Sequence, residues 1–138
     1  MRKLVLYLSL FTILLVQSCG KESDYVADVP IDIKIYPSSP SYSKLTGVGG
    51  YVTIAGGVAG IILYKKTTGQ IVAYDRCSSY NPEGKCAVNV NEPSITATDP
   101  CSGSLFSLED GSSLKAPATR PLKQYQVTVT SSQISIFN

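Results

Sequence analysis

The sequence of 138 residues contains no histidine. Without an imidazole, the chain can form neither a Ser-His-Asp triad nor a Cys-His nucleophile, and it cannot supply a metal site that uses His. It also lacks a basic surplus, because the residues other than Arg2 and Lys3 include ten basic and ten acidic side chains. Binding to nucleic acid depends on neutralising many phosphates, so we expect no nucleic-acid partner. We favour a non-catalytic protein and leave enzymatic activity open.

Other absences concern the architecture. No segment shows a sustained helical period, and no internal repeat is present. The one long apolar run, residues 4–16, is too short to cross a bilayer as a helix. A chain of this length is expected to form one domain with one core.

The first 18 residues have the layout of a secretory signal peptide. Arg2 and Lys3 precede the apolar run, and a short polar end follows it. Ser18 directly before Cys19, with Val16 three positions before it, resembles the lipobox of bacterial lipoproteins. In those proteins the chain is cut before the Cys, and the thiol carries a lipid. An ordinary signal peptide or an N-terminal anchor is the alternative.

This interpretation divides the chain into three parts. We expect a signal peptide over 1–18, a polar tether over 19–30 and one domain over 31–138. Lipidation of Cys19 would attach the protein to a membrane of the bacterial cell envelope, where another envelope protein is a possible partner. Which face of the outer membrane it occupies is left open.

The domain is predicted to be all-β. Short alternating runs rich in β-branched residues are separated by turns that contain Gly, Asn or Pro. This pattern indicates a small antiparallel β-sandwich or barrel. The expected strands are 31–36, 51–55, 61–66, 71–76, 86–90, 94–98, 105–108 and two strands within 125–137.

Several polar and aromatic residues have both a plain and a functional interpretation. Tyr74, Tyr80 and Tyr125 are expected to pack on the β surface, with a ligand groove as the alternative. Asp75 and Arg76 at a strand end are expected to be solvated or to form an exposed ion pair.

The cell envelope permits disulfides. If Cys19 carries a lipid, the remaining thiols are Cys77, Cys86 and Cys101, so one disulfide leaves one thiol over. The count alone does not select the pair.

The order of motifs after residue 49 resembles the Rieske-type ferredoxin domain. The pieces that carry the resemblance are Cys77, CSGSLF at 101–106, Gly111, PATRPL at 117–122 and YQV at 125–127. The resemblance covers about residues 49–136, most of the chain after Cys19. It implies a small antiparallel β fold that holds a [2Fe–2S] cluster between two loops, one with Cys-x-His and one with Cys-x-x-His. A third, proline-containing loop covers the cluster.

The ligand positions carry over one by one. Cys77 stands at the first cluster Cys, and Ser79 stands where a His belongs. When the second loop is aligned on its Pro-x-x-Gly-Ser pattern, Asp99 replaces the second Cys and Ser102 replaces the second His. Asp99 before a proline is also a common turn residue that bonds backbone amides. A weak metal site that includes Asp99 is the alternative.

A second alignment makes Cys101 the cluster Cys and Ser104 the lost His. In the preferred alignment, Cys101 instead falls on a Cys that in the family bonds across to the end of the first loop. The resemblance then implies a Cys86–Cys101 disulfide. Cys77–Cys101 and Cys77–Cys86 are the alternatives.

Both alignments leave the site without either His, and three Cys cannot supply a Cys₄ set. We therefore expect no cofactor, with a [2Fe–2S] cluster as the alternative. The expected function is that of a cell-envelope lipoprotein whose Rieske-like domain is a non-catalytic binding or structural module. An iron–sulfur electron-transfer protein or oxidoreductase subunit is the first alternative. A glycan- or peptide-binding β-sandwich unrelated to Rieske domains is the second.

Overall fold

A computed structural model of the chain describes residues 25–138. The predicted signal peptide 1–18, the lipidation site Cys19 and the tether residues up to 24 lie outside the described residues. Within residues 25–138, no helix is long and apolar enough to cross a membrane.

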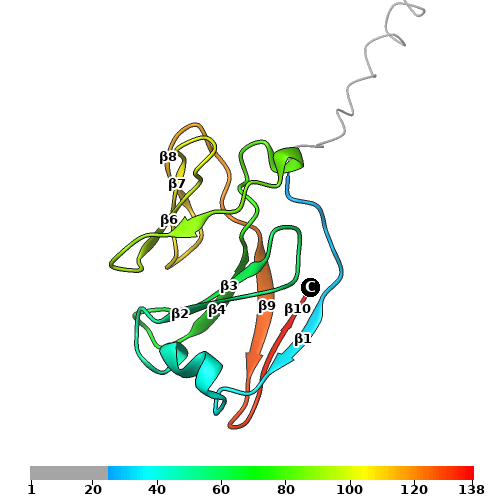
Figure 1. The fold of residues 1–138 in the computed structure, drawn as a ribbon, viewed down its shortest axis with the longest axis vertical. Coiled ribbons are helices and arrows are strands. Elements are labelled where there is room, and N and C mark those ends of the chain that lie inside the picture. Colours follow the sequence, from blue (N-terminus) through cyan, green and yellow to red (C-terminus); the bar gives the residue numbers. More distant parts are fainter. Residues whose placement is uncertain (1–24) are drawn as a thin grey trace, which may run out of the picture.

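The strands form two antiparallel sheets, which confirms the predicted all-β class (Figure 1). The larger sheet has the strand order β1-β10-β9-β4-β3-β2 and curls around its own core. Its strands are β1 (Asp32–Ile35), β2 (Tyr51–Ile54), β3 (Ile61–Lys65), β4 (Ile71–Asp75), β9 (Gln124–Val129) and β10 (Ile134–Phe137). The smaller sheet has the order β5-β6-β7-β8. Its strands are β5 (Asn89–Val90), β6 (Thr96–Thr98), β7 (Leu105–Ser107) and β8 (Ser113–Lys115).

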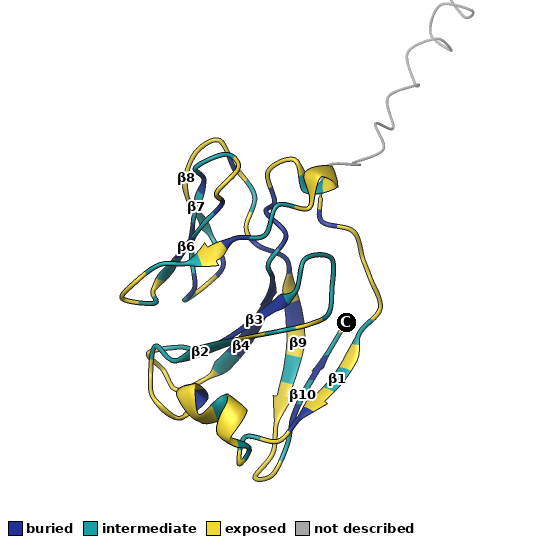
Figure 2. Ribbon diagram, in the orientation of Figure 1, coloured by how far each residue is buried: buried dark blue, intermediate teal, exposed yellow. Residues whose placement is uncertain are grey.

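Strand β3 is buried on both faces, which explains its unbroken apolar sequence (Figure 2). Successive side chains of a strand point to opposite sides. Ile61 and Leu63 accordingly join one core cluster, while Ile62 and Tyr64 join the other. Both clusters must therefore form for this strand to be covered.

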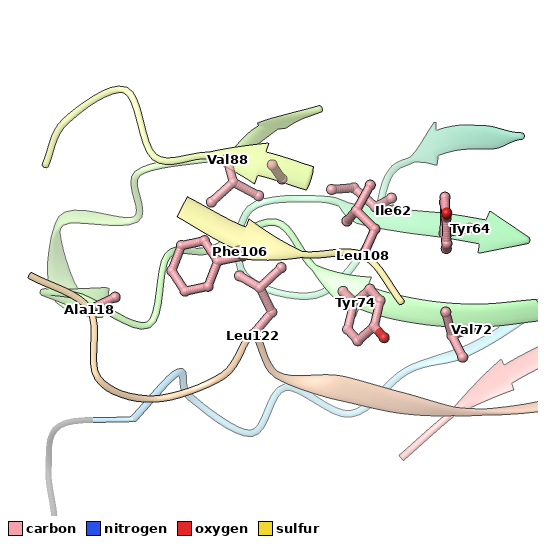
Figure 3. Packing of buried hydrophobic residues seen from close by; sticks show 10 residues of the cluster. Ile62, Tyr64, Val72, Tyr74, Val88, Phe106, Leu108, Ala118 and Leu122 are labelled. Atoms are coloured by element: carbon pink, nitrogen blue, oxygen red, sulfur yellow. The ribbon is translucent and has the colours of Figure 1, made fainter. Parts of the chain in front are cut away.

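The cluster around Ile62 joins the two sheets (Figure 3). Phe106 in β7 and Leu108 just after it pack against this cluster from the smaller sheet. Leu122, in the segment that leads into β9, completes the cluster. Full burial of a side chain such as Phe106 contributes about 1.5–3 kcal/mol. This packing fixes the smaller sheet, and the loops that it carries, on the larger one.

Several elements differ from the prediction, among them the 3₁₀ helix η2 (Pro82–Gly84), which was not expected. The expected strand 86–90 is reduced to β5, because Cys86 belongs to a cross-linked loop. Strand β8 and the 3₁₀ helix η1 (Pro40–Thr46) were not predicted. Proline is compatible with the first turn of a helix, and Leu45 is the buried residue of η1.

Residues 25–30, here called the N-terminal strap, lie along the domain. Val26 is buried, and the Lys123 Nζ donates to the Ala27 carbonyl at 2.9 Å and to the Asp28 carboxylate at 2.7 Å. The Asn138 amide also donates to Asp28, at 2.8 Å. Hydrogen bonds from Lys123 and Asn138 hold the pKa of Asp28 below its ordinary value. The described end of the predicted tether is thus part of the folded unit.

Candidate functional site

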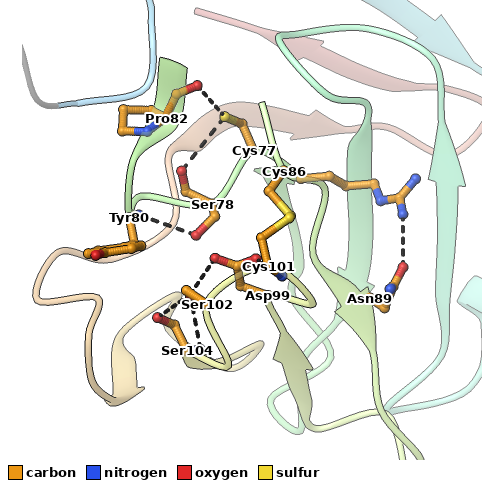
Figure 4. The surroundings of a disulfide bond; sticks show 11 residues. Cys77, Ser78, Tyr80, Pro82, Cys86, Asn89, Asp99, Cys101, Ser102 and Ser104 are labelled. Atoms are coloured by element: carbon orange, nitrogen blue, oxygen red, sulfur yellow. Dashed lines mark hydrogen bonds between the residues drawn. A yellow bond between two sulfur atoms is a disulfide. The ribbon is translucent and has the colours of Figure 1, made fainter. Parts of the chain in front are cut away.

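Three loops meet at one end of the domain (Figure 4). We call them loop one (residues 76–88), loop two (residues 99–104) and the proline loop (residues 116–122). Loop one contains the short 3₁₀ helix η2 (Pro82–Gly84) and closes on itself through a bridge between Cys77 and Ala87. All the residues singled out at the sequence level as cluster positions lie in the first two of these loops.

Cys86 and Cys101 form a disulfide between loop one and loop two. Their Cα atoms are 6.4 Å apart, within the range that a disulfide requires. This is the pair that the resemblance favoured. The covalent link fixes the distance between the two loops.

Asp99 lies directly beside this disulfide and is almost completely buried. Its carboxylate accepts the Cys101 amide at 2.8 Å and the Ser102 hydroxyl at 2.6 Å, as expected of a turn residue. Burial raises the pKa of Asp99, but hydrogen bonds from Ser102, Ser78 and nearby amides outweigh burial and lower it overall. The carboxylate is therefore charged and internally bonded at neutral pH.

Cys77 is the free cysteine of the described residues, and it is buried. Its thiol donates to the carbonyls of Ser78 at 3.7 Å and Pro82 at 3.5 Å. Burial raises its pKa to about 11, with further contributions from the carboxylates of Asp75 and Asp99. The group at the first cluster position is thus a protonated thiol turned toward the carbonyls of its own loop.

Two serines attach the proline loop to the other loops. The Ser79 hydroxyl donates to the Arg120 carbonyl at 2.6 Å, which joins loop one to the proline loop. The buried Ser104 hydroxyl accepts the Ala118 amide at 3.0 Å, which joins loop two to it. Together with the disulfide, these bonds connect each loop to the other two.

Asp75 is the buried residue that the sequence interpretation placed wrongly on the surface. Its carboxylate accepts the Tyr125 hydroxyl at 2.7 Å and the Cys77 amide at 2.8 Å. It also accepts the amides of Val58 at 2.7 Å and Ala59 at 3.2 Å. A Cβ at Gly57 would overlap this carboxylate, so the turn needs glycine there. Asp75 is thus a structural anchor for the base of loop one.

Its neighbour Arg76 directs its side chain to other partners. The Arg76 Nε donates to the Val88 carbonyl at 3.2 Å, and its guanidinium also donates to the Asn89 side chain at 3.3 Å. The expected exposed Asp75–Arg76 pair is therefore wrong. Each side chain serves a different segment.

An open groove of about 580 Å³ lies between loop one and the proline loop. Ser79, Tyr80 and Glu83 line one side, and Pro117 and Thr119 line the other. Of the three tyrosines considered in the sequence, Tyr74 and Tyr125 are buried in the core, and Tyr80 is exposed in this groove.

Solved structures share this arrangement of sheets and loops. One is the cyanobacterial plasma membrane Rieske protein PetC3 from Synechocystis PCC 6803, with a TM-score of 0.56 and 23% identity over 75% of this chain and 99% of that chain. The chain has a Rieske-type fold. A second match, with a TM-score of 0.52 and 19% identity over 78% of this chain and 93% of that one, comes from a complex of reduced oxygenase and oxidized ferredoxin in carbazole 1,9a-dioxygenase. No family model and no curated protein matches the chain.

These matches correct the expectation of no cofactor. The structures that share the Rieske-type fold are a Rieske protein and a complex with a ferredoxin, and Rieske centres are [2Fe–2S] clusters. The expectation that the chain carries no cofactor is therefore wrong as a starting assumption for this fold. A cluster stands as the alternative named from the sequence.

The donors at the four cluster positions do not make the ligand set of such a cluster. A [2Fe–2S] cluster takes four ligands, which are Cys thiolates or, in Rieske centres, two Cys and two His. The Rieske-type domain offers one protonated thiol at Cys77, one carboxylate at Asp99 and the hydroxyls of Ser79 and Ser102. All four of these groups already bond within the loops, at hydrogen-bond distances of 2.6–2.8 Å or, for the thiol, 3.5 Å.

One group of metal-binding residue types converges in the part of the chain that the structure describes. The sulfur atoms of Cys86 and Cys101 and a carboxylate oxygen of Asp99 lie within 4.8 Å of one another. Because the two sulfurs are joined in a disulfide, the group presents one carboxylate rather than three ligands. Cys77 is not a member of this group.

Proposed function

We propose that the chain is a lipid-anchored protein of the bacterial cell envelope whose Rieske-type domain is a non-catalytic binding or structural module. The observation that carries the proposal is the state of the cluster positions. Asp99, Ser79 and Cys77 each bond to the protein's own backbone or side chains, and a disulfide spans the loops. Loops fixed in this way suit the presentation of a rigid surface.

The groove between loop one and the proline loop supports a binding role. Its lining combines an exposed aromatic side chain, Tyr80, with polar groups such as Ser79 and Glu83. Aromatic anchors with polar neighbours are typical of protein interfaces. We propose another protein of the envelope as the partner.

Electron transfer is the second candidate function. The observation in its favour is the fold, which is shared with a Rieske protein and with a complex that contains a ferredoxin. Since the chain contains no His, an electron carrier built on it would need a ligand set other than that of a Rieske centre.

One preparation tests both candidates. The full chain is produced in a bacterial host with its own signal peptide and purified from the envelope fraction. The mass of the N-terminal peptide should show a lipid on Cys19, which the Cys19→Ala variant should lack. Redox titration followed by EPR, together with assays of iron and sulfide, then tests whether the protein carries electrons. A reversible one-electron transition with stoichiometric iron and sulfide would refute the binding module and support the electron carrier.

A further inference from the structure

The N-terminal strap begins at the loop end, which we define as loop one, loop two and the proline loop. The guanidinium of Arg120 in the proline loop lies 5.7 Å from the centre of the Tyr25 ring. Figure 1 shows the first described residues beside η2 and the helix η1 at the opposite end of the domain. The chain that precedes Tyr25 therefore leaves the domain at the loop end.

The strap is held in this position along its length. Val26 is 4% exposed, and Lys123 binds Ala27 and Asp28 through two hydrogen bonds of 2.9 and 2.7 Å. Farther along, the Asn138 amide donates to the Val29 carbonyl at 3.0 Å. These contacts connect the strap to the residue that precedes β9 and to Asn138, so its exit point is fixed relative to the whole domain.

The length of chain before the strap limits how far the loop end can lie from a lipid. Six residue steps separate Cys19 from Tyr25, and a fully extended chain of that length spans about 20 Å. A domain of this size has a radius of gyration of about 13 Å and is therefore about 35 Å across. A lipid on Cys19 would therefore keep Tyr25 close to the bilayer, while η1 can lie a full domain diameter farther away.

We infer that the anchored domain turns its loop end toward the bilayer, so that a protein partner would reach the groove at the membrane surface. The inference rests on the proposed lipid at Cys19. The surface chemistry of the loop end fits this orientation, because Tyr80 is 44% exposed at the groove and Lys85 is exposed in loop one. Tyrosine rings and lysine side chains are favoured at the level of lipid headgroups.

The test places a reporter at each end of the lipidated full chain. Tyr80→Cys marks the loop end and Ser43→Cys marks η1, each in a Cys77→Ser background, and both receive the same fluorophore. The proteins are reconstituted in vesicles of phosphatidylethanolamine and phosphatidylglycerol that contain a headgroup-labelled quencher lipid. We expect quenching at position 80 to be several-fold greater than at position 43. Equal quenching, or stronger quenching at 43, would overturn the inference.

Two variants separate the orientation from the anchor. Tyr25→Ala removes the contact with Arg120 and should reduce the difference between the two reporters, whereas the matched change at the exposed Tyr36 should leave it intact. Cys19→Ala should abolish quenching at both sites. A Cys19 without lipid would refute the anchor and the inference together, whereas a lipidated protein with equal reporters would refute the inference alone.

A second measurement needs no introduced cysteine. An amine-reactive, membrane-impermeant reagent is applied to the lipidated protein in vesicles of phosphatidylcholine and phosphatidylglycerol, whose headgroups carry no primary amine, and to the Cys19→Ala protein in solution. Lys85 should be modified several-fold more slowly in the vesicles, while Lys44 in η1 should react at the same rate in both samples. An unchanged rate at Lys85 would contradict the orientation even if the labelled variants fail to fold.

Discussion

The Cys86–Cys101 disulfide lies beside the buried carboxylate of Asp99, with the two Cα atoms 6.4 Å apart. It joins the two loops that hold the cluster in Rieske domains. The covalent bond cross-links loop one and loop two directly. The stability of the loop end should therefore depend on this bond.

Removal of the disulfide should destabilise the domain. The double variant Cys86→Ser/Cys101→Ser opens a link between residues 15 positions apart, which the chain-entropy model values at about 3 kcal/mol. Urea unfolding of the wild type and the variant measures this loss. A reducing agent should lower the stability of the wild type to that of the variant and leave the variant unchanged. Equal stability of the oxidised wild type and the variant would show that the bond does not support the loops.

Cys77 should behave as an unreactive, protonated thiol. Burial and the carboxylates of Asp75 and Asp99 raise its pKa from 9.0 to about 11. The thiolate is the reactive form, so alkylation by iodoacetamide at pH 8 should be far slower in the folded protein than in urea. Fast alkylation of the folded protein would place the thiol at the surface.

The same shift predicts a loss of stability in alkali. A group whose folded pKa is raised contributes stability that is complete below pH 9 and is lost as the pH rises through about 11. The Cys77→Ser variant should show a smaller decline between these two pH values. Parallel pH profiles for wild type and variant would contradict this assignment.

The hydrogen bond from Tyr125 to Asp75 should stabilise the base of loop one. Tyr125→Phe removes a 2.7 Å bond to a fully buried carboxylate, and bonds to charged groups contribute about 1.5–3 kcal/mol. Tyr36→Phe removes a hydroxyl from a residue that is 57% exposed and serves as the matched control. Chemical denaturation of both variants should show a loss for position 125 alone.

Asp99 should make the domain sensitive to acid. Burial opposes its charge, but the hydrogen bonds from Ser102, Ser78 and nearby amides dominate and lower its pKa below 3.8. Its contribution to stability is therefore present above that pH and is lost as the pH falls through the folded pKa. The deficit of Asp99→Asn relative to the wild type should shrink between pH 7 and acidic pH. The same substitution at the exposed Asp32 is the control.

The strand pattern could be predicted because it depends on local alternation. Each long strand of the larger sheet lies within two residues of its expected range, and β3 shows why a continuous apolar run is also compatible with a strand. Strand β8 has little apolar alternation of its own and depends on pairing with β7. Such short edge elements are determined by tertiary contacts rather than by local sequence.

The site could be predicted only in part. The resemblance favoured the Cys86–Cys101 pair, which the structure contains, because the motif order locates the loops. Its assignment of the cluster positions stays a prediction. The burial of Asp75 was missed because the groups that donate hydrogen bonds to its carboxylate are distant in the sequence. They come from a turn 16–17 residues earlier and from Tyr125, 50 residues later. The course of the strap was missed for the same reason, because its partners Lys123 and Asn138 are about 100 residues away.

A peptide map of the protein purified from the envelope under non-reducing conditions tests the central claim most directly. The account predicts one linked peptide pair that contains Cys86 and Cys101, and Cys77 as a free thiol. A map in which Cys86 and Cys101 are both free, or in which Cys77 forms the bridge, would contradict the account of a loop end held by this disulfide.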